Sequence, residues 1–417
     1  MNDDICVLGL GYIGLPTASI FATRGKKVLG VDVVPQVVET INAGKIHIEE
    51  PDLDVLVRAA VQSGNLRAAR QPSPAATYII AVPTPFRKEA DQRKTPDLAF
   101  VEQATRSIAP VVPAGALIIL ESTSPVGTTE KVRDWLREEL QRLRKPEAMS
   151  LGASLRFAHC PERILPGQML KELVANDRIA GGLTPEAATA ARDLYRAFCT
   201  GEIFLTDART AELAKLTENS FRDVNIAFAN ELSLVCEKLD INVWELIRLA
   251  NRHPRVKILQ PGPGVGGHCI AVDPWFIVDA APDEARLIRT AREVNDSKPE
   301  RVREWIRQAA AQFPQPVIAC FGLAFKADVD DLRESPAVEI VEHLAHDDLG
   351  EILAVEPHIK MLPNPLAAGG KVKLVDASTA LARSNVVVLL VSHRVFGDID
   401  RKKLEGKAVV DTRGFWK

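Results

Sequence analysis

The 417-residue sequence has no excess of basic residues and no long apolar run. With 52 Lys and Arg against 55 Asp and Glu, its net charge is −3. Proteins that bind nucleic acids or anionic membranes carry a basic excess, so neither is expected as the main partner. No run reaches the roughly 18 to 20 apolar residues that span a bilayer. The acidic start, Met1-Asn2-Asp3-Asp4, is not typical of a signal peptide.

Closely spaced cysteines are also absent. Six dispersed cysteines predict reduced thiols and a cytoplasmic protein rather than a disulfide framework. The content of 46% hydrophobic and 26% charged residues is typical of a soluble globular protein. A chain of this length is expected to form about two or three domains.

Short apolar runs alternate with helical segments in the first half of the chain. This alternation predicts a parallel sheet with helices on both faces. The charged stretch 87–95 is expected to be a surface loop. The strands are predicted at residues 5–8, 28–31, 78–82, 117–120, 155–158 and 203–205, with helices that include 96–108 and 129–143.

The amino-acid composition changes at residue 207, and the following stretch contains no proline or glycine up to residue 239. Its Ala, Leu, Glu and Asn content predicts one long helix. Further helices are expected at 243–251 and 285–296. Apolar strands return after Pro316, at 317–321, 352–355, 373–375, 386–391 and 408–410. The predicted fold is α/β, with two Rossmann-like parallel-sheet domains (1–206 and 301–417) joined by a long central helix in a helical region (207–300).

A glycine-rich turn, Gly9-x-Gly11-x-x-Gly14, follows the first strand and opens a helix. Glycine at these positions allows a tight turn, a close approach of the backbone to a pyrophosphate, and close packing of helix on strand. The helix N-terminus offers unpaired N–H groups to phosphates. Asp32 closes the next strand, where a carboxylate suits the ribose diol of NAD and would repel the 2′-phosphate of NADP. The sequence therefore predicts NAD binding.

A second glycine-rich segment, 260–269, contains four glycines and two prolines and ends in Cys269. Exposed backbone N–H groups could lower the pKa of the thiol and form an oxyanion site, which predicts a nucleophile. The alternative is a buried cysteine in a tight loop. His268 is a poor candidate for the base, since adjacent side chains point apart. Asp273-Pro274 is typical of the start of a helix.

Other polar residues share a helix face or follow predicted strands. The spacing of three polar residues places them on one helix face: Lys215, Asn219 and Arg222. This face either lines a polar pocket or is exposed to solvent. Glu162 and Arg163 follow a strand, where α/β sheets bind ligands, although a surface ion pair would also explain them.

Thr84 and Thr123 also come directly after strands, and turn formation is the alternative explanation for both. His343 and His346 are spaced as on a solvated helix face and lack further metal ligands, so no metal is predicted.

Several long sequence motifs, spread over nearly the whole chain, resemble those of the UDP-glucose/GDP-mannose dehydrogenase family. Within the family they most resemble members that act on UDP-N-acetyl-D-mannosamine. The family strings are Gly9-Leu-Gly-Tyr-Ile-Gly-Leu-Pro16, Pro161-Glu-Arg163, Ala214-Lys-Leu-Thr-Glu-Asn219, Gly266-Gly-His-Cys269, Phe321-Gly-Leu-Ala-Phe-Lys326 and Arg333-Glu-Ser-Pro336, and the more specific strings cover 218–225, 251–256 and 265–275. The longer charged loop 87–95 departs from the family pattern.

The resemblance implies a four-electron oxidation of a sugar primary alcohol to a carboxylate by two NAD in turn. Cys269 would trap the intermediate aldehyde as a thiohemiacetal, and the second oxidation would give a thioester that water hydrolyses. The implied substrate is UDP-N-acetyl-D-mannosamine, which would yield UDP-N-acetyl-D-mannosaminuronate for surface polysaccharides. The alternatives are a UDP-N-acetylglucosamine or UDP-glucose 6-dehydrogenase, and a non-catalytic, NAD-binding redox sensor.

The resemblance also implies roles for individual residues and a homodimer formed through the central helix. His253 or Arg255 would then reach the neighbouring subunit's site, and the last domain would bind the UDP-sugar. The implied catalytic residues are Cys269, Lys215, Asn219, Asp273, Glu162 and Thr123. The implied cofactor contacts are Gly9, Gly11, Tyr12, Ile13, Gly14, Asp32, Thr84, Thr123 and Arg333. The implied substrate contacts are Arg163, Ile164, Lys215, Asn219, Arg222, His253, Arg255, Gly266, Phe325 and Lys326.

Overall fold

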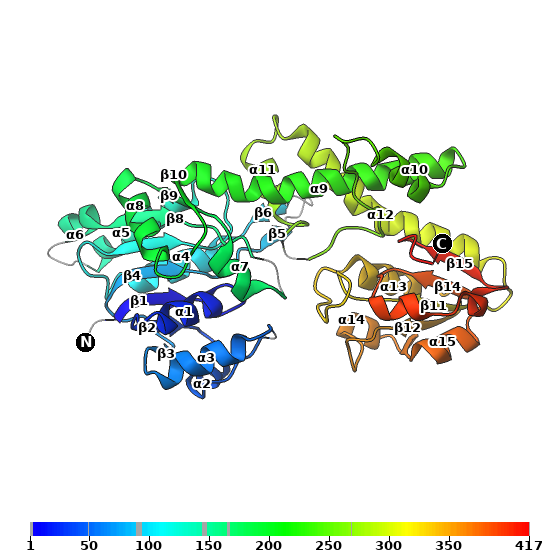
Figure 1. Cartoon of the computed structure of the whole chain (residues 1–417), viewed down its shortest axis with the longest axis horizontal. Helices are drawn as coiled ribbons and strands as arrows, with labels where there is room; N and C mark the ends of the chain where they lie inside the picture. Colours follow the sequence, from blue (N-terminus) through cyan, green and yellow to red (C-terminus); the bar gives the residue numbers. More distant parts are fainter. Residues whose placement is uncertain are drawn as a thin grey trace. The chain divides into compact units, whose positions relative to one another are not determined.

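The computed structural model describes residues 3–48, 50–88, 94–143, 148–164, 167–267 and 269–416 (Figure 1). His268 and part of the expected loop 87–95 lie outside these ranges. The chain forms two compact units. Unit 1 comprises Met1–Glu218 and Trp275–Ala281, and unit 2 comprises Asn219–Pro274 and Pro282–Lys417.

Unit 1 is built on an eight-stranded sheet of order β10-β9-β8-β7-β4-β1-β2-β3. The strands are β1 (Asp3–Leu8), β2 (Val28–Val31), β3 (Leu66–Ala69), β4 (Ala75–Ile80), β7 (Leu117–Leu120), β8 (Arg156–His159), β9 (Arg178–Gly182) and β10 (Ile203–Asp207). Neighbouring strands are parallel except β8 and β9. The predicted parallel sheet is therefore confirmed from β3 to β8, while β9 and β10 run antiparallel to those strands, because the chain returns from β8 to β9 without a crossover.

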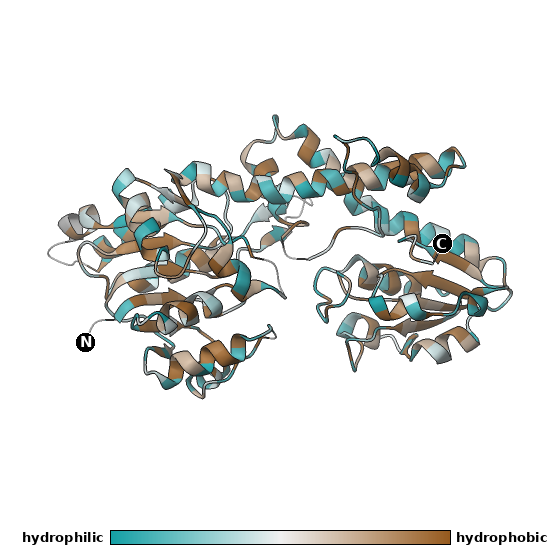
Figure 2. Cartoon of the chain, in the orientation of Figure 1, coloured by the Kyte–Doolittle hydropathy of each residue, from teal (hydrophilic) through white to brown (hydrophobic). Residues whose placement is uncertain are grey.

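Helices cover both faces of this sheet, as the sequence predicts. Side chains alternate along β1, so that Ile5 and Val7 pack into one core with α1 and α3, while Cys6 and Leu8 pack into a second core with α4 and α5. The strands are accordingly among the most hydrophobic parts of the chain (Figure 2). The helices of unit 1 are α1 (Gly14–Thr23), α2 (Pro35–Asn42), α3 (Leu53–Gln62), α4 (Ala99–Ile108), α5 (Thr128–Arg142), α6 (Ala148–Ser154), α7 (Met169–Ala175) and α8 (Pro185–Tyr195).

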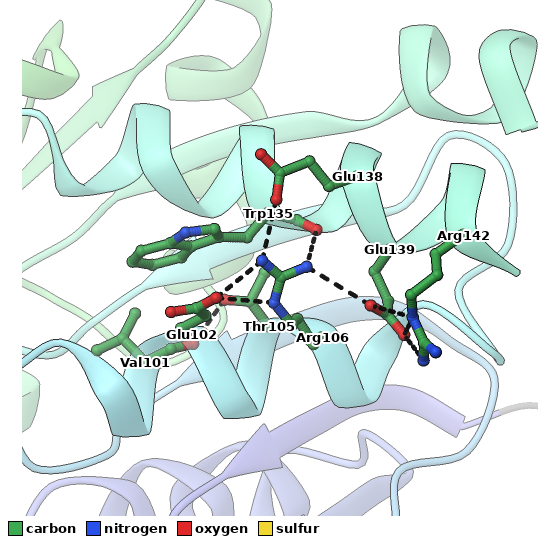
Figure 3. A network of polar contacts seen from close by, with 8 residues as sticks. All are labelled: Val101, Glu102, Thr105, Arg106, Trp135, Glu138, Glu139 and Arg142. Carbon is green, nitrogen blue, oxygen red and sulfur yellow. Dashed lines mark hydrogen bonds and ion pairs between the residues drawn. The ribbon is translucent and has the colours of Figure 1, made fainter.

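A polar network at the surface joins α4 to α5 (Figure 3). Arg106 on α4 pairs with Glu102 at 2.8 Å and with Glu138 on α5 at 2.9 Å. Glu139 accepts from Arg106 at 3.5 Å and also pairs with Arg142. Each exposed pair contributes at most about 1 kcal/mol, so the network adds little to the stability of the fold.

The charged stretch 87–95 is not simply a loop. β5 (Phe86–Lys88) and β6 (Lys94–Pro96) pair antiparallel on either side of residues 89–93. Lys94 also lies over the ring of Trp275, 4.9 Å from its centroid. The expected surface loop is therefore wrong at its two ends, because charge alone does not reveal two short strands that pair with each other.

The long helix predicted at 207–239 is confirmed as α9 (Ala208–Lys238), which carries residues of both units. It is followed by α10 (Val243–Ala250), α11 (Asp273–Ala280) and α12 (Arg286–Ala310). Helix α12 extends beyond residue 296, where the sequence predicts its end, and it contains Pro299. Burial of Val302 and Ile306 on the far side of this proline outweighs the lost hydrogen bond.

Unit 2 contains a five-stranded parallel sheet of order β13-β12-β11-β14-β15. Its strands are β11 (Val317–Phe321), β12 (Glu351–Val355), β13 (Val372–Leu374), β14 (Val386–Leu389) and β15 (Ala408–Asp411). Each lies within two residues of a predicted strand. The remaining helices are α13 (Pro336–Asp347), α14 (Asn364–Ala367) and α15 (Ala377–Arg383), with 3₁₀ turns at Arg394–Asp398 and Arg401–Leu404.

No helix in the described ranges is both long enough and apolar enough to cross a membrane.

Candidate active site

The glycine-rich turn of unit 1 has the geometry of a dinucleotide site. Gly9 has φ +91°, and a Cβ on Gly14 would lie 1.9 Å from the Gly9 carbonyl oxygen. Both positions therefore require glycine. A Cβ on Gly11 would meet no atom within 4 Å. The space above Gly11, at the N-terminus of α1, thus fits the pyrophosphate of a dinucleotide.

Asp32 lies beside this turn, directly after β2. Its carboxylate accepts the backbone N–H of Leu10 at 3.1 Å and that of Val34 at 3.0 Å. Two hydrogen bonds therefore hold the acid at the strand end, where the ribose of NAD would bind. Tyr12, with 38% of its surface exposed, and the half-buried Ile13 complete the turn.

Thr84 and Thr123 come together at the same edge of the sheet, after the adjacent strands β4 and β7. The Thr84 hydroxyl donates to the Thr123 carbonyl oxygen at 2.6 Å. This long-range contact joins the loop after β4 to the loop after β7. The Thr123 side chain is half-buried at this edge.

Glu162 and Arg163 follow β8, and each is part of a different ion pair. Glu162 binds Arg178 at 2.5 Å, and both side chains are buried. Arg163 binds Glu218 at 2.7 Å and is 32% exposed. The alternative of an ion pair thus describes both residues, although the Glu162 pair lies in the interior rather than on the surface. The half-buried Ile164 packs against the apolar core next to α1.

Glu121, which no local pattern distinguishes, lies at the centre of this buried cluster. Its carboxylate accepts from the Tyr195 hydroxyl at 2.8 Å and from the Thr17 hydroxyl on α1 at 3.2 Å. Burial, followed by the negative charge of Glu162, raises the pKa of Glu121 to about 7. The cluster connects the cofactor helix α1 to the ends of β7 and β8. An acid after an apolar run carries no local signal of burial.

Unit 2 joins the cysteine loop to α9. The Asp273 N–H, at the start of α11, donates to the Cys269 carbonyl oxygen at 2.8 Å. The Asn219 side-chain amide donates to the Asp273 carboxylate at 2.5 Å. Three residues with implied catalytic roles are therefore connected by two hydrogen bonds. Lys215 precedes Asn219 by one turn of α9, and Arg222 follows it as an exposed residue.

Cys269 is also distinguished from the other five thiols by its exposure. All six cysteines lie in the described ranges and are reduced, and Cys269 is the exposed one. Burial raises the pKa of Cys6 and that of Cys320 to about 12, so neither forms a thiolate at neutral pH. Burial raises the pKa of Cys160 and that of Cys236 as well. Because its thiol is exposed, Cys269 is the best candidate nucleophile among the six cysteines.

The glycines of the cysteine loop pack against the segment that carries Phe325. A Cβ on Gly266 would lie 2.3 Å from the Glu334 carbonyl oxygen. A Cβ on Gly267, where φ is +85°, would lie 3.0 Å from the Phe325 ring. Lys326, next in the chain, is exposed. The structure therefore brings two of the implied substrate residues, Gly266 and Phe325, to one region of unit 2.

The other implied ligand residues of unit 2 lie on exposed segments. Arg333 is exposed and binds Asp331 at 2.6 Å. His253 and Arg255 follow α10, where the Arg255 N–H donates to the His253 ring at 3.3 Å.

Two further residues contact the cysteine loop, and neither was predicted from the sequence. Asn230 on α9 accepts the Gly262 N–H at 2.9 Å. A Cβ on Gly262 would lie 2.5 Å from the guanidinium of Arg413, whose pKa burial lowers to about 10. Only long-range packing reveals these partners, because they are 32 and about 150 residues away in the chain.

A strand, a glycine turn opening a helix, and an acid after the next strand are typical of a dinucleotide-binding domain, the kind of domain that nicotinamide-dependent dehydrogenases contain. Three family models match the chain along most of its length. They are the NAD-binding domain (residues 3–199), the central domain (209–297) and the UDP-binding domain (319–417) of the UDP-glucose/GDP-mannose dehydrogenase family. The chain belongs to this family and is an NAD-dependent UDP-sugar dehydrogenase. The alternative of a non-catalytic redox sensor is therefore set aside.

Relatives with assigned activities match over nearly their whole length. The chain is 60% identical over 412 residues to an NDP-N-acetyl-D-galactosaminuronic acid dehydrogenase of Ralstonia nicotianae, covering 99% of this chain and 96% of that one. It is 55% identical over 421 residues to the UDP-N-acetyl-D-mannosamine dehydrogenase of Escherichia coli K12, covering 99% of each. The solved structure of a UDP-D-ManNAc dehydrogenase from Pyrococcus horikoshii superposes with a TM-score of 0.88 at 38% identity, covering 99% and 96%.

Proposed function

We propose that the protein oxidises UDP-N-acetyl-D-mannosamine to UDP-N-acetyl-D-mannosaminuronate in two steps, through a covalent bond to Cys269. The observation that carries this proposal is the hydrogen-bonded connection of Cys269, Asp273 and Asn219 in unit 2. Relatives at 55% identity that bear the name of this activity support the substrate.

The covalent step explains why one enzyme needs both a dinucleotide fold and an exposed thiol. Bound NAD would supply the hydride acceptor for each oxidation, at the glycine turn of unit 1. The first oxidation removes a hydride and a proton from the alcohol and leaves an aldehyde. The Cys269 sulfur adds to this carbonyl carbon, which gives a thiohemiacetal with a hydride to lose. The second oxidation gives a thioester, and water then releases the carboxylate and restores the thiol.

The remaining catalytic roles follow from the polar groups around this chemistry. The Lys215 ammonium would stabilise the developing alkoxide, an effect worth several kcal/mol in a dry site. Asn219 and Thr123 would hold the sugar and a water molecule. Asp273 and Glu162 would orient or deprotonate that water. Because Glu162 is already bound to buried Arg178, orientation is the better supported role for it.

Cofactor and substrate would bind through the groups that the family pattern indicates. Basic side chains would bind the diphosphate of UDP. Glycine and aromatic residues would let the nucleotide approach closely. The proposed cofactor contacts are Gly9, Gly11, Tyr12, Ile13, Gly14, Asp32, Thr84, Thr123 and Arg333. The proposed substrate contacts are Arg163, Ile164, Lys215, Asn219, Arg222, His253, Arg255, Gly266, Phe325 and Lys326.

A second substrate has specific support. The Ralstonia relative at 60% identity acts, by its name, on a nucleotide-linked N-acetyl-D-galactosaminuronic acid. A nucleotide-linked N-acetylgalactosamine is therefore the second candidate.

Initial rates with four substrates test this assignment. We expect kcat/KM for UDP-N-acetylmannosamine to exceed those for UDP-N-acetylgalactosamine, UDP-N-acetylglucosamine and UDP-glucose by about tenfold or more, because misplaced sugar hydroxyls leave buried polar groups unpaired. A higher value for the galactosamine sugar would transfer the assignment to the second candidate.

We further propose a homodimer formed through α9. Phe221, Phe228 and Val235 are 71%, 52% and 45% exposed and follow each other at seven-residue spacing. Such a spacing places them on one face of the helix, and an exposed apolar stripe of this kind is typical of an interface. Dispersed, reduced cysteines support the cytoplasm as the location.

A further inference from the structure

Segment 323–328 of unit 2 carries Phe325 and Lys326, two of the proposed substrate contacts. It begins after β11 and Gly322, whose φ is +90°, and it ends at Asp328, whose φ is +60°. A non-glycine residue in the left-handed region needs contacts that hold it there. The backbone N–H groups near both ends of the segment bind one buried pair of side chains, Glu356 and His393.

Glu356 holds the start of the segment. It follows β12, and its Oε2 atom accepts the N–H of Leu323 at 2.7 Å and that of Ala324 at 3.1 Å. Its other oxygen accepts the His358 N–H at 3.1 Å. The Glu356 side chain has no exposed surface, so these bonds are shielded from water.

His393 holds the end of the segment. Its Nδ1 atom accepts the Asp328 N–H at 2.9 Å, and its Nε2 atom lies 3.0 Å from the Glu356 carboxylate. A backbone N–H can only donate, so Nδ1 is unprotonated and Nε2 carries the hydrogen that binds Glu356. The ring is fully buried.

The same region could be interpreted as a metal site, since one ligand atom each from Asp328, His358 and His393 lies within 4.8 Å of the others. The hydrogen bonds argue against this. Both ring nitrogens of His393 already have partners, and the Asp328 carboxylate binds the Arg394 guanidinium at 2.8 Å. A metal ion would have to displace a backbone N–H or a buried carboxylate and would face a cation.

We propose that Glu356 and His393 are positioning residues for the nucleotide of the substrate, because they fix segment 323–328 and thereby Phe325 and Lys326. This inference rests on the proposed function. The charged or titratable groups around the histidine are Glu356, Asp328, His358, whose ring centroid is 4.9 Å away, and Arg394.

The test measures binding of UDP by titration calorimetry, without turnover. We expect His393→Phe, which preserves the ring shape but neither hydrogen bond, to raise the dissociation constant for UDP about tenfold or more, and NAD binding to unit 1 to stay within about twofold. His393→Asn keeps an acceptor near the position of Nδ1, so we expect it to recover most of the affinity. The matched control is His358→Ala, which removes an exposed neighbouring ring and keeps the backbone bond to Glu356.

Each outcome has a distinct meaning. If the wild-type chain binds UDP and His393→Phe binds it equally well, the positioning role is contradicted and the proposed function is unaffected. If the wild-type chain does not bind UDP, the proposed substrate class fails, and the inference fails with it. Should His393→Phe lose NAD binding as well, Glu356→Gln replaces it in the same comparison. Equal losses of UDP and NAD affinity in both variants would contradict a local role.

Discussion

Replacing Cys269 with serine should lower the rate of uronate formation by about a thousandfold or more and leave NAD binding unchanged. The hydroxyl of serine is a much weaker nucleophile than a thiolate, so the aldehyde would not be captured, and the second oxidation would have no covalent substrate. The glycine turn and Asp32 belong to unit 1, whereas the Cys269 loop belongs to unit 2. The substitution therefore leaves the proposed cofactor contacts of unit 1 in place.

Two measurements on the same preparation check this expectation. Uronate is quantified by mass spectrometry, and NAD binding by titration calorimetry. The matched control is Cys199→Ser, because this buried thiol lies in unit 1 and donates to the carbonyl oxygens of Asn176 and Gly201, which a hydroxyl can also bind. Unchanged turnover in Cys269→Ser, or an equal loss in the control, would contradict the covalent route.

Replacing Arg292 with methionine should cost about 3 to 5 kcal/mol of the free energy of unfolding. Arg292 on α12 binds Asp223 on α9 at 2.6 Å, and the two side chains are 1% and 0% exposed. Removing the guanidinium leaves a buried carboxylate with Asn295 as its remaining side-chain donor. Breaking a buried pair is far more costly than breaking a surface pair, because the remaining charge stays desolvated.

Urea unfolding followed by circular dichroism measures this cost. Arg301→Met is the control on the same helix, since Arg301 is 37% exposed and its pairs with Glu237 and Glu304 should contribute about 1 kcal/mol or less.

The loss of stability in Arg292→Met should also depend on pH. Burial raises the pKa of Asp223 already in the wild type. An acid with a raised pKa in the folded state favours folding at low pH, so the destabilisation should be smaller at pH 5 than at pH 8. Equal losses for both variants would contradict the account.

The sequence predicts those features that depend on neighbouring residues. The glycine turn, the acid after β2 and the absence of helix breakers in α9 are local patterns, and the structure has each of them where the pattern lies. The central strands β11 and β14 of unit 2 are likewise continuous apolar runs, because both faces of the sheet are buried there.

Features that depend on distant partners are not visible in the sequence. The direction of β9 and β10 depends on how the chain returns after β8. The continuation of α12 through Pro299 depends on the burial of side chains that follow this proline in the helix. The roles of Glu121 and His393 depend on partners 104 and 37 residues away. A single acid or histidine after a strand looks the same in the sequence whether it faces solvent or a buried partner.

The amount of NADH formed per UDP-sugar decides whether one enzyme oxidises each substrate molecule twice. A limiting, weighed amount of UDP-N-acetylmannosamine is converted to completion with excess NAD, and NADH is read from its absorbance. We expect two equivalents of NADH per sugar, with no aldehyde released. One equivalent per sugar would contradict the double oxidation.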